Sequence, residues 1–380
     1  MIENISLSAS KKTAIITFLG NAYKDSRVVN LIDSLNKLNF KTNTISFDWK
    51  TPNFNSQYGQ TVIHKLDKSK SSLSFYLNFF YLLIRDLLKT KANYYFAEDI
   101  YTLPITYFFA KKNKAKIFYN SREIYAHLGG LRNKNTIQKI ISKIESKFIR
   151  KVDLVLVTGE MDADYLRDSY GINNFFILRN LPKYKESISK IDLRSRLNIS
   201  LESKIILYQG VILEGRGIKK TIDLIEKIPN IHFVIVGEGE FRNKFEKYSV
   251  EKKLEKRIHF IGAVNHSELL NYTAGADIGL ALIENISISY YYALPNKLFE
   301  YIMAGIPIFA SNLPQMKKII DEYNVGKYVD PENENEMIKN LEELIKDQKL
   351  LSDFTANCKK ASKILNWENE FEKFKELHLN

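Results

Sequence analysis

The stretch YYYALPNKLFEYIMAGIPIFAS, residues 290–311, contains the start of a helix, the end of that helix and the start of a strand. Pro295 favours a first helical turn, and apolar residues recur four positions apart after it. Gly305 supplies a C-terminal cap, and Pro307 prevents the helix from continuing into the apolar run IPIFAS. The stretch therefore predicts a helix over 295–304 followed by a buried strand, a local order typical of parallel α/β sheets.

The same alternation of strand and helix runs through both halves of the chain. Short apolar runs that end in glycine or a polar residue alternate with segments whose apolar residues recur every three or four positions. Strands are predicted in the first half at 14–19, 41–47, 93–99, 115–123, 153–159 and 175–180, and in the second half at 203–210, 232–239, 258–262, 277–283, 306–311 and 326–330. The pattern predicts two doubly wound α/β units, joined by a polar linker at 181–200, with ligands at the carboxyl ends of their strands.

Composition limits the class of protein. The 380 residues fit two domains, and 45% of them are hydrophobic, which is ample for two cores. One cysteine, Cys358, excludes a disulfide framework and favours a reducing compartment. The first residues do not resemble a signal peptide, and no run reaches the roughly 18 apolar residues of a spanning helix. We expect a cytoplasmic protein, with the apolar segment 75–88 as a buried or interfacial helix.

The net charge of +12 comes from the first half of the chain. Residues 1–180 hold 27 Lys and Arg against 15 Asp and Glu, whereas the remaining residues hold 29 of each. A lysine bias of the whole genome would act on both halves. The asymmetry favours an anionic partner for the first half: a membrane surface, a phosphate-bearing lipid or nucleic acid. No helix-turn-helix, RNA-recognition or zinc signature accompanies it, which argues against nucleic acid.

Two segments of the second half indicate a phosphate-bearing ligand. The helix at 295–304 begins at the carboxyl edge of a predicted sheet, where its N–H groups favour an anion and Lys297 adds a positive charge. Glu300 suits a ribose diol, although a first-turn glutamate also stabilises a helix without any ligand. In YQGVILEGRGIKK (208–220), two glycines flank Arg216, whose guanidinium can clamp a diphosphate. VGEGE (236–240) is a further glycine-rich loop at a strand end.

These segments together resemble a known family. YQGVILEGRGIKKTI, FVIVGEGE, IHFIGAV, ADIGLALI and ALPNKLFEYIMAGIPIFAS are similar to the second domain of retaining glycosyltransferases of the GT-B fold, the family-four-like group 1 enzymes. FAEDIYTLP, IFYNSREIY, DLVLVTGEMDADYLRDSYG and WENEFEKF resemble elements of the first domain and the terminal helix. The resemblance implies two Rossmann-like domains facing a central cleft: an acceptor-binding domain at 1–185, a nucleotide-sugar-binding domain at 200–362, and a helix at 363–380 that returns to the first domain.

The resemblance also implies an activity. The enzyme would move a sugar, of the hexosyl type, from a nucleotide-diphosphate sugar to an acceptor hydroxyl with retention of configuration, in the assembly of a surface polysaccharide, lipopolysaccharide or capsule, or glycolipid. The donor would be a UDP- or GDP-sugar, and no metal or other cofactor is expected. Two alternatives stay open: a catalytically silent, glycosyltransferase-like partner subunit, and a nucleotide-sugar epimerase of the same fold.

Site residues follow from the matching positions. The resemblance assigns the donor ribose to Glu300, the diphosphate to Arg216, Lys297 and the backbone of Leu298, and the base to the neighbourhood of Val264. The remaining donor-site candidates are Gly20, Asn21, Gly237 and Asn296. Candidates for acceptor contact and proton transfer are Glu98, Asp99, Arg122, Glu123 and His127. The sequence departs from the family pattern at Tyr292, where a first glutamate is usual, at Val211, where an arginine is common, and at Arg122, where a histidine is common.

The basic first half then suggests a membrane-linked acceptor. An aromatic helix at 75–84 is predicted to dip into the membrane interface, which would place the enzyme at the inner face of the cytoplasmic membrane beside a lipid-linked glycan. The lysine clusters expected to face anionic lipid are Lys65, Lys68 and Lys70; Lys111, Lys112, Lys114 and Lys116; and Lys139, Lys143, Lys147, Arg150 and Lys151.

Overall fold

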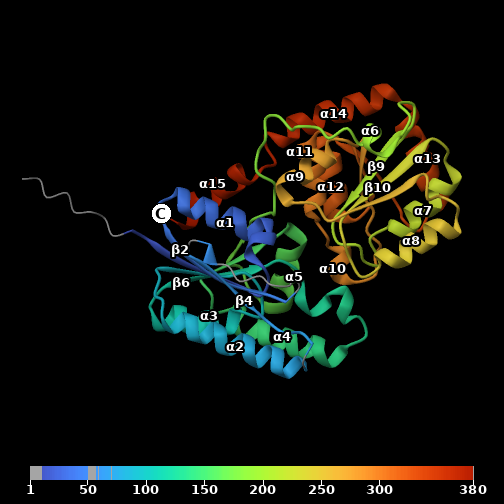
Figure 1. Ribbon diagram of the computed structural model, residues 1–380. Helices are drawn as coiled ribbons and strands as arrows, with labels where there is room; N and C mark the ends of the chain where they lie inside the picture. Colours follow the sequence, from blue (N-terminus) through green and yellow to red (C-terminus); the bar gives the residue numbers. More distant parts are fainter. Residues whose placement is uncertain (1–10, 50–56, 59, 70, 380) are drawn as a thin grey trace, which may run out of the picture. The chain divides into compact units, whose positions relative to one another are not determined.

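The structure is a computed structural model that describes residues 11–49, 57–58, 60–69 and 71–379. It contains two compact units, each built on its own sheet (Figure 1). The first unit comprises the described part of 1–126 together with 134–158 and 162–178. The second comprises 127–133, 159–161 and the described part of 179–380. Both are Rossmann-like units, as the sequence predicted.

The first unit has an eight-stranded sheet in the order β3-β4-β2-β1-β5-β6-β7-β8, parallel except where β3 meets β4. Its strands are β1 (Thr13–Phe18), β2 (Lys41–Asp48), β3 (Gln57–Tyr58), β4 (Thr61–Lys65), β5 (Tyr94–Ala97), β6 (Lys116–Ser121), β7 (Leu154–Val157) and β8 (Phe175–Ile177). The sequence did not predict β3 and β4. The run of β4 is short, and its polar His64 and Lys65 hide the alternation.

Helices cover both faces of this sheet. They are α1 (Ser26–Lys37), α2 (Ser72–Leu88), α3 (Leu103–Lys112), α4 (Asn135–Ile149) and α5 (Glu160–Tyr170), with 3-10 turns η1 (Ala22–Lys24) and η2 (Tyr125–His127). The 3-10 turn η3 (Gly129–Leu131) belongs to the second unit. Asp25 caps α1 by accepting a hydrogen bond from Val28 N at 2.9 Å. Helices α2, α3 and α4 lie side by side on the face opposite α1, and α3 contacts both of its neighbours (Figure 1).

The second unit has a six-stranded parallel sheet in the order β11-β10-β9-β12-β13-β14. Its strands are β9 (Lys204–Gln209), β10 (Ile231–Val236), β11 (Ile258–Gly262), β12 (Ile278–Ala281), β13 (Ile308–Ser311) and β14 (Gly326–Val329). Its helices are α6 (Leu193–Leu197), α7 (Ile218–Lys227), α8 (Arg242–Glu251), α9 (His266–Thr273), α10 (Ile288–Tyr291), α11 (Asn296–Ala304), α12 (Pro314–Tyr323), α13 (Glu334–Lys346), α14 (Gln348–Ser362) and α15 (Trp367–His378). A separate apolar core lies on each face of this sheet.

The helix predicted from the opening stretch is α11. Pro295 is its N-cap, so the helix starts one residue later than predicted, and Gly305 ends it with a φ of 73°. That left-handed conformation favours glycine and explains the sharp stop. Leu298 and Ile302 are fully buried in the core between the sheet and α14. The helix is thus held rigidly, with its first turn next to the sheet edge.

The segment predicted as a polar linker differs from expectation. Residues 193–197 form α6, and the side chains of Leu193 and Ile199 are buried in the core of the second unit. Their apolar side chains are spread among many charged neighbours, which hides the pattern. Close by, Arg179 makes a bidentate ion pair with Glu370 of α15, with distances of 2.7 and 2.8 Å. The pair ties the terminal helix to the beginning of this segment.

The strand order places a switch point in each sheet. In the second unit the chain runs outward from β9 to β10 and β11, then continues on the other side of β9 with β12. In the first unit the corresponding point lies between β1 and β5. Ligands of doubly wound sheets bind outside the carboxyl ends of strands at such points. The candidate residues are therefore best examined at these two places.

Candidate functional site

The loop after β9 lies at the switch point of the second unit. Gly217, the N-cap of α7, has a φ of 70°, and a Cβ at this position would come within 2.4 Å of Leu282 Cβ, just after β12. Only glycine allows this close approach. The loop therefore packs against the end of β12. The side chain of the preceding Arg216 lies where β9 and β12 end.

The guanidinium of Arg216 stacks on an aromatic ring. Its carbon Cζ lies 4.5 Å from the ring centroid of Tyr290, a residue of α10. Arg216 is half-buried and makes no ion pair with any residue that the structure describes. A ring below the guanidinium plane fixes its orientation while the edge donors stay available. This arrangement suits an anionic ligand with several oxygens.

Lys297, in the first turn of α11, is a second cation at the same place. Its side chain is buried, and Nζ lies 3.6 Å from the ring centroid of Tyr208 at the end of β9. Burial holds the pKa of Lys297 well below its ordinary value; the nearby Arg216 lowers it further and Glu300 raises it. Within the described part of the chain no carboxylate forms an ion pair with Lys297. A ligand phosphate would supply the missing counter-charge.

Glu300 is the third ionisable group of this cluster. Gln209, the last residue of β9, donates its side-chain amide to Glu300 Oε2 at 2.5 Å. Thr273 Oγ1 donates to Gln209 Oε1 at 2.6 Å and so fixes which way the amide faces. Burial raises the pKa of Glu300, while the bond from Gln209 and the charges of His266 and Lys297 oppose this effect. The carboxylate is held in one orientation beside two cations.

The other donor-site candidates lie around this cluster. Gly237 ends β10 with a φ of 151° beside Gly210, and Val264 is half-buried after β11 against the core. Asn296 is exposed at the start of α11. The structure differs from expectation at Leu298, because its N–H already donates to Pro295 O at 3.0 Å. A tight first turn uses this amide, so the phosphate contact expected from Leu298 is not available in this conformation.

In the first unit, Glu98 was expected to contact the acceptor or to transfer a proton, and the structure encloses its side chain. Glu98 is completely buried, and its Oε2 accepts from Arg122 at 2.5 Å and from Asn120 at 2.9 Å. Arg122 also pairs with Asp25 at 2.7 Å and stacks over Phe18 at 4.6 Å. These neighbours raise the pKa of Arg122, against the effect of burial. The network anchors Arg122 at the edge of the sheet.

Asp99, Gly20 and Asn21 are also engaged within the first unit. Asp99 is buried and accepts from Leu19 N at 2.6 Å and from Thr102 N at 2.8 Å. Burial raises its pKa to about 6, with the backbone bonds opposing the rise. Asn21 donates to Asp48 at 2.7 Å and accepts from Tyr23 N at 3.0 Å, so its side chain shapes the loop after β1. Gly20 leaves no room for a Cβ beside the ring of Phe18.

Glu123 and His127 have more open positions. Glu123 is exposed just after β6, and His127 is half-buried in η2, where burial lowers its pKa. Buried polar atoms without a hydrogen-bond partner among the described residues include Glu98 Oε1, Asn120 Oδ1 and Arg122 Nε. Three such atoms in one network mark the end of β6 as the polar centre of the first unit.

Comparison with known proteins agrees with this geometry. Residues 189–361, which carry the Arg216, Lys297 and Glu300 cluster, match the family Glycosyl transferases group 1. The match covers most of the second unit and does not extend into the first. The chain is 24% identical over 184 residues to the protein named "Uncharacterized glycosyltransferase MJ1607" of Methanocaldococcus jannaschii, covering 47% of this chain and 46% of that protein. Matches to the curated relatives span 44% to 60% of their length.

Solved structures with the GT-B fold superpose on nearly the whole chain. WaaG, a glycosyltransferase involved in lipopolysaccharide biosynthesis, gives a TM-score of 0.75 at 13% identity, covering 97% of this chain and all of WaaG. Anabaena Alr3699/HepE in complex with UDP gives 0.71 at 14% identity, covering 96% of this chain and 98% of that chain. At such low identity these likenesses establish the fold, and both units are those of GT-B proteins.

The sequence did not reveal the residues that hold the charged groups of this site. Tyr208 lies under Lys297, Tyr290 lies under Arg216, and Gln209 orients Glu300. Tyr208 and Gln209 end a buried strand directly before a glycine, a position whose side chains lie at the ligand edge of the sheet. That signal was available in the sequence. No local pattern in the sequence indicates the role of Tyr290, since that role depends on how α10 packs next to Arg216 in the loop after β9.

Proposed function

We propose that the protein transfers a sugar from a nucleotide-diphosphate sugar to an acceptor hydroxyl. The observation that carries this proposal is the cluster at the β9–β12 switch point, where two cations without a counter-ion, Arg216 and Lys297, accompany the oriented carboxylate of Glu300. A nucleoside diphosphate offers each of them a partner: phosphate oxygens for the cations and a ribose diol for the carboxylate. The match of residues 189–361 to the family Glycosyl transferases group 1 and the UDP bound by HepE support the same assignment.

The chemistry requires stabilisation of a leaving group. When the bond between the sugar and the diphosphate breaks, negative charge accumulates on the diphosphate. Arg216, Lys297 and the first turn of α11 would stabilise that charge from fixed positions, which is where electrostatic catalysis is most effective. Burial of Lys297 increases the strength of its interaction with a phosphate, because water screens it less. We assign no side-chain nucleophile, and the retention of configuration in this proposal rests on the family resemblance.

The acceptor is proposed to be a glycan or a lipid-linked glycan of a surface polysaccharide, lipopolysaccharide or glycolipid pathway, reached at the inner face of the cytoplasmic membrane. The lipopolysaccharide role of WaaG, which shares the fold, supports this choice. We propose Arg122 and Glu123 of the first unit, together with His127, as acceptor-side residues, with Glu98 and Asp99 as positioning residues. Arg122 would be the main polar contact, because Asp25 and Glu98 hold it rigidly at the end of β6.

The test begins with thermal melting in the presence of UDP, GDP, ADP, CMP, dTDP and their sugars. A ligand that binds only the folded protein stabilises it by about 2.7 kcal/mol at one hundred times its dissociation constant. We expect an upward shift of the melting temperature with one nucleoside diphosphate. Arg216→Ala and Lys297→Met should remove most of that shift. Lys247→Ala, at a lysine whose side chain is 80% exposed on α8, is the matched control and should leave the shift unchanged.

The nucleotide that shifts the melting temperature identifies the sugar donors to test for transfer, read as release of the free nucleoside diphosphate in the presence of glycan acceptors. Absence of a shift with every nucleotide would overturn the donor assignment and favour a partner subunit without activity. Interconversion of free nucleotide sugars without an acceptor would instead identify an epimerase.

A further inference from the structure

Helix α2 has apolar side chains on two opposite faces. Phe75, Phe79, Leu83 and Leu87 recur every four residues and are buried against the sheet. A second row faces solvent, and its members and exposed fractions are Leu73 70%, Leu77 60%, Tyr81 63%, Ile84 39% and Leu88 62%. A helix that is apolar on both sides normally has a partner on each side. Within the helix at 75–84 that was expected to dip into a membrane interface, Phe75 and Phe79 therefore belong to the core.

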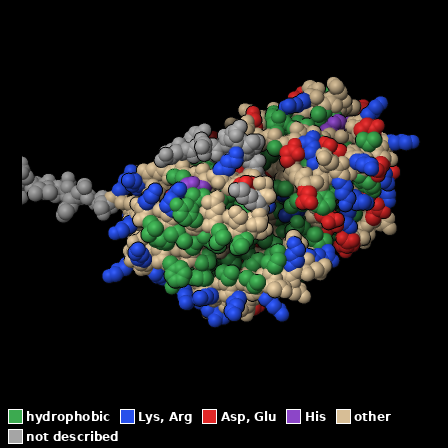
Figure 2. Space-filling view, turned by 60° about the horizontal axis from the view of Figure 1, so that its bottom comes forward, with side chains coloured by type: hydrophobic (Ala, Val, Ile, Leu, Met, Phe, Trp, Pro, Cys, Tyr) green, Lys and Arg blue, Asp and Glu red, His purple; other side chains and the backbone are tan. Residues whose placement is uncertain are grey.

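The outward apolar row continues over the two neighbouring helices. On α3, Phe108 is 61% exposed, and on α4, Ile137, Ile140 and Ile144 are 44%, 53% and 38% exposed. Phe108 packs edge-on against Phe148 of α4 at 5.8 Å, so the rows on these two helices are adjacent. Figure 2 shows the hydrophobic side chains gathered on this face, with Lys and Arg around its edge. We call this the α2–α4 apolar face.

Basic residues dominate around the α2–α4 apolar face, and an exposed carboxylate after α4, Asp153, lies 3.5 Å from Lys111. Along the described residues of α2, α3 and α4 there are two acidic side chains, Asp86 and Glu145. Asp86 is paired with His64 and Arg85, and Glu145 is 1% exposed and accepts hydrogen bonds from two tyrosines. Neither contributes a free negative charge to the surface. The exposed basic residues in and directly after these helices are Lys89, Lys91, Lys111, Lys112, Lys114, Lys139, Lys143, Lys147, Arg150 and Lys151.

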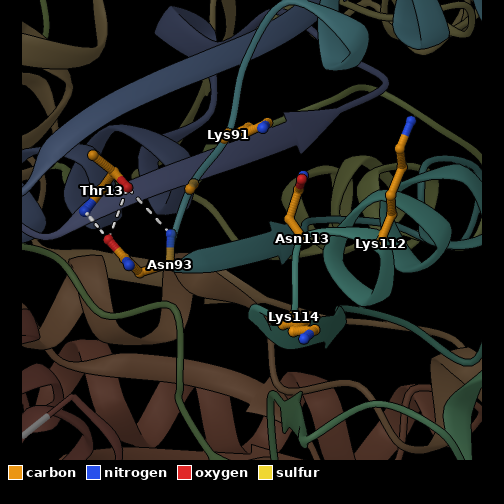
Figure 3. Close-up of a pocket in the computed structure, with 7 residues that line it drawn as sticks. Thr13, Lys91, Asn93, Lys112, Asn113 and Lys114 are labelled. Atoms are coloured by element: carbon orange, nitrogen blue, oxygen red, sulfur yellow. Dashed lines mark hydrogen bonds between the residues drawn. The ribbon is translucent and has the colours of Figure 1, made fainter.

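A pocket with three lysines borders the same face. It has a volume of about 400 Å³ and is lined by Thr13, Lys91, Ala92, Asn93, Lys112, Asn113 and Lys114 (Figure 3). Thr13 and Asn93 hydrogen-bond to one another at 2.8 Å and hold the floor of the pocket. Lys112 lies one helical turn after the exposed Phe108, so the two side chains share one side of α3. The pocket therefore joins a basic, polar site to the edge of an apolar surface.

We propose that the α2–α4 apolar face lies on an anionic phospholipid bilayer, with the three-lysine pocket receiving a lipid phosphate. A bilayer interface takes up exposed leucine, isoleucine and aromatic side chains, and its anionic headgroups complement a rim of lysines. A second copy of the chain fits less well, because a symmetric pair would bring two like-charged rims together. Among the described helices none is long and apolar enough to cross a bilayer, so the contact is with the surface.

The basic residues of this contact differ in part from those expected from the sequence. Lys111, Lys112, Lys114, Lys139, Lys143 and Lys147 belong to the rim or the pocket. Lys65 is the last residue of β4, near one end of the strand order, whereas α4 precedes β7, near the other end. Lys68 Nζ lies 5.8 Å from the ring centroid of Trp49. Lys70 lies outside the described residues. We therefore assign the membrane contact to the three helices and leave the 65–70 cluster out.

Vesicle flotation tests the surface directly. The full chain is mixed with phosphatidylcholine vesicles with or without phosphatidylglycerol, and the floated fraction is measured. We expect flotation with the anionic vesicles, a smaller fraction with neutral ones, and a loss in high salt. The triple variant Leu73→Ser, Leu77→Ser, Tyr81→Ser should remain in the soluble fraction. Its control, Leu201→Ser, Val250→Ser, Leu377→Ser, replaces side chains of the second unit that are 86%, 58% and 69% exposed and should float like the wild type.

A separate set of variants tests the three-lysine pocket. Lys91→Glu, Lys112→Glu, Lys114→Glu should weaken binding to anionic vesicles about 100-fold, because each basic residue contributes roughly 1 kcal/mol near an anionic surface. Lys247→Glu, Lys318→Glu, Lys346→Glu changes the net charge equally, at exposed lysines of the second unit, and should weaken it much less. Equal losses in the two variants would overturn the headgroup assignment.

Two results would overturn the surface proposal: wild-type protein that stays soluble with anionic vesicles, or a dimer that the apolar substitutions convert to monomers without any effect on flotation. The proposal deepens the proposed function, since it names the surface from which a lipid-linked acceptor would be reached. Its failure can be told apart from failure of the donor assignment, because nucleotide-dependent melting is read separately and should be unchanged in every surface variant.

Discussion

The side-chain amide of Gln209 donates a 2.5 Å hydrogen bond to the carboxylate of Glu300, across the gap between β9 and α11. Thr273 donates to the other end of the same amide at 2.6 Å. The relay leaves one oxygen of Glu300 held and the other available for a ligand. A strand end that contributes no charge of its own therefore decides how the Glu300 carboxylate is oriented.

Replacement of Glu300 should weaken nucleoside binding whether or not phosphates are present. A hydrogen bond to a charged group contributes about 1.5–3 kcal/mol, so we expect Glu300→Ala to weaken binding of uridine, UMP and UDP by similar factors of at least tenfold. Isothermal titration calorimetry with the three ligands measures this. Gln209→Leu should give a smaller loss of the same kind, because Glu300 remains but is no longer oriented.

The matched comparison for this prediction is Arg216→Ala. Its loss should appear with UDP and be nearly absent with uridine, since the guanidinium is assigned to the diphosphate. If Glu300→Ala affects only the diphosphate ligand, the assignment of Glu300 to the ribose is wrong. If GDP binds and UDP does not, the same series is made with guanosine, GMP and GDP.

Gly237 should be essential for the shape of the donor-site loops. Its φ is 151°, and a Cβ on it would lie 1.9 Å from the carbonyl oxygen of Gly210, which cannot move without disturbing β9. We expect Gly237→Ala to lower the melting temperature by several degrees, through a destabilisation of about 1–3 kcal/mol. Gly130→Ala is the control, because a Cβ there meets no atom within 4 Å. Equal melting temperatures for the two variants would show that the loop can relax.

The sequence was sufficient for the fold of the second unit because local and long-range signals coincide there. The cap at Gly305 and the apolar spacing of α11 identify the helix without tertiary information. Glycine loops after β9 and β10 mark the ligand edge. What the sequence could not show is which groups meet: the stacking of Lys297 on Tyr208 depends on the crossing of α11 and β9, and no local pattern encodes that distance.

In the first unit, the sequence indicated where candidate residues lie along the sheet edge but not whether their side chains are buried. Glu98 and Asp99 end a strand, and this position correctly brought them to the switch point. The sequence could not show that β5 and β6 would enclose their carboxylates, because burial depends on the surrounding packing. The exposed row on α2 was also hidden, since one apolar run supplies both the core face and the outer face of that helix.

Glu98 should contribute to stability through the ion pair with Arg122. Breaking a buried pair by removing one partner typically costs about 3–5 kcal/mol, and because Arg122 keeps Asp25 as a partner, the cost here should lie at the lower end of that range. We therefore expect Glu98→Gln to lower the free energy of unfolding, measured in urea, by roughly that amount, while nucleotide binding by the folded variant is unchanged. Asp25→Asn, whose side chain is 26% exposed, should cost less. A variant at Glu98 with unchanged stability but lost transfer would instead show a direct part in the reaction.

The histidine pair in the second unit should make stability fall at mildly acidic pH. His232 Nδ1 and His259 Nε2 lie 3.0 Å apart with stacked rings. Burial, with the neighbouring His232, lowers the pKa of His259 to about 4, and burial also lowers the pKa of His232. The unfolded chain, with the ordinary value near 6.5, therefore binds protons that the folded chain does not. Stability is retained above pH 6.5 and is lost as pH falls from there toward 4.

The variant His259→Phe keeps a stacked ring and removes the titration. Because the pair is half exposed, screening reduces its effect, and we expect the wild type to lose about 1 kcal/mol more than the variant between pH 7.5 and pH 5. Melting temperatures measured across this range should run parallel for the two proteins above pH 7 and diverge below it. Parallel curves over the whole range would mean that the pair takes up its proton without loss of the folded contacts.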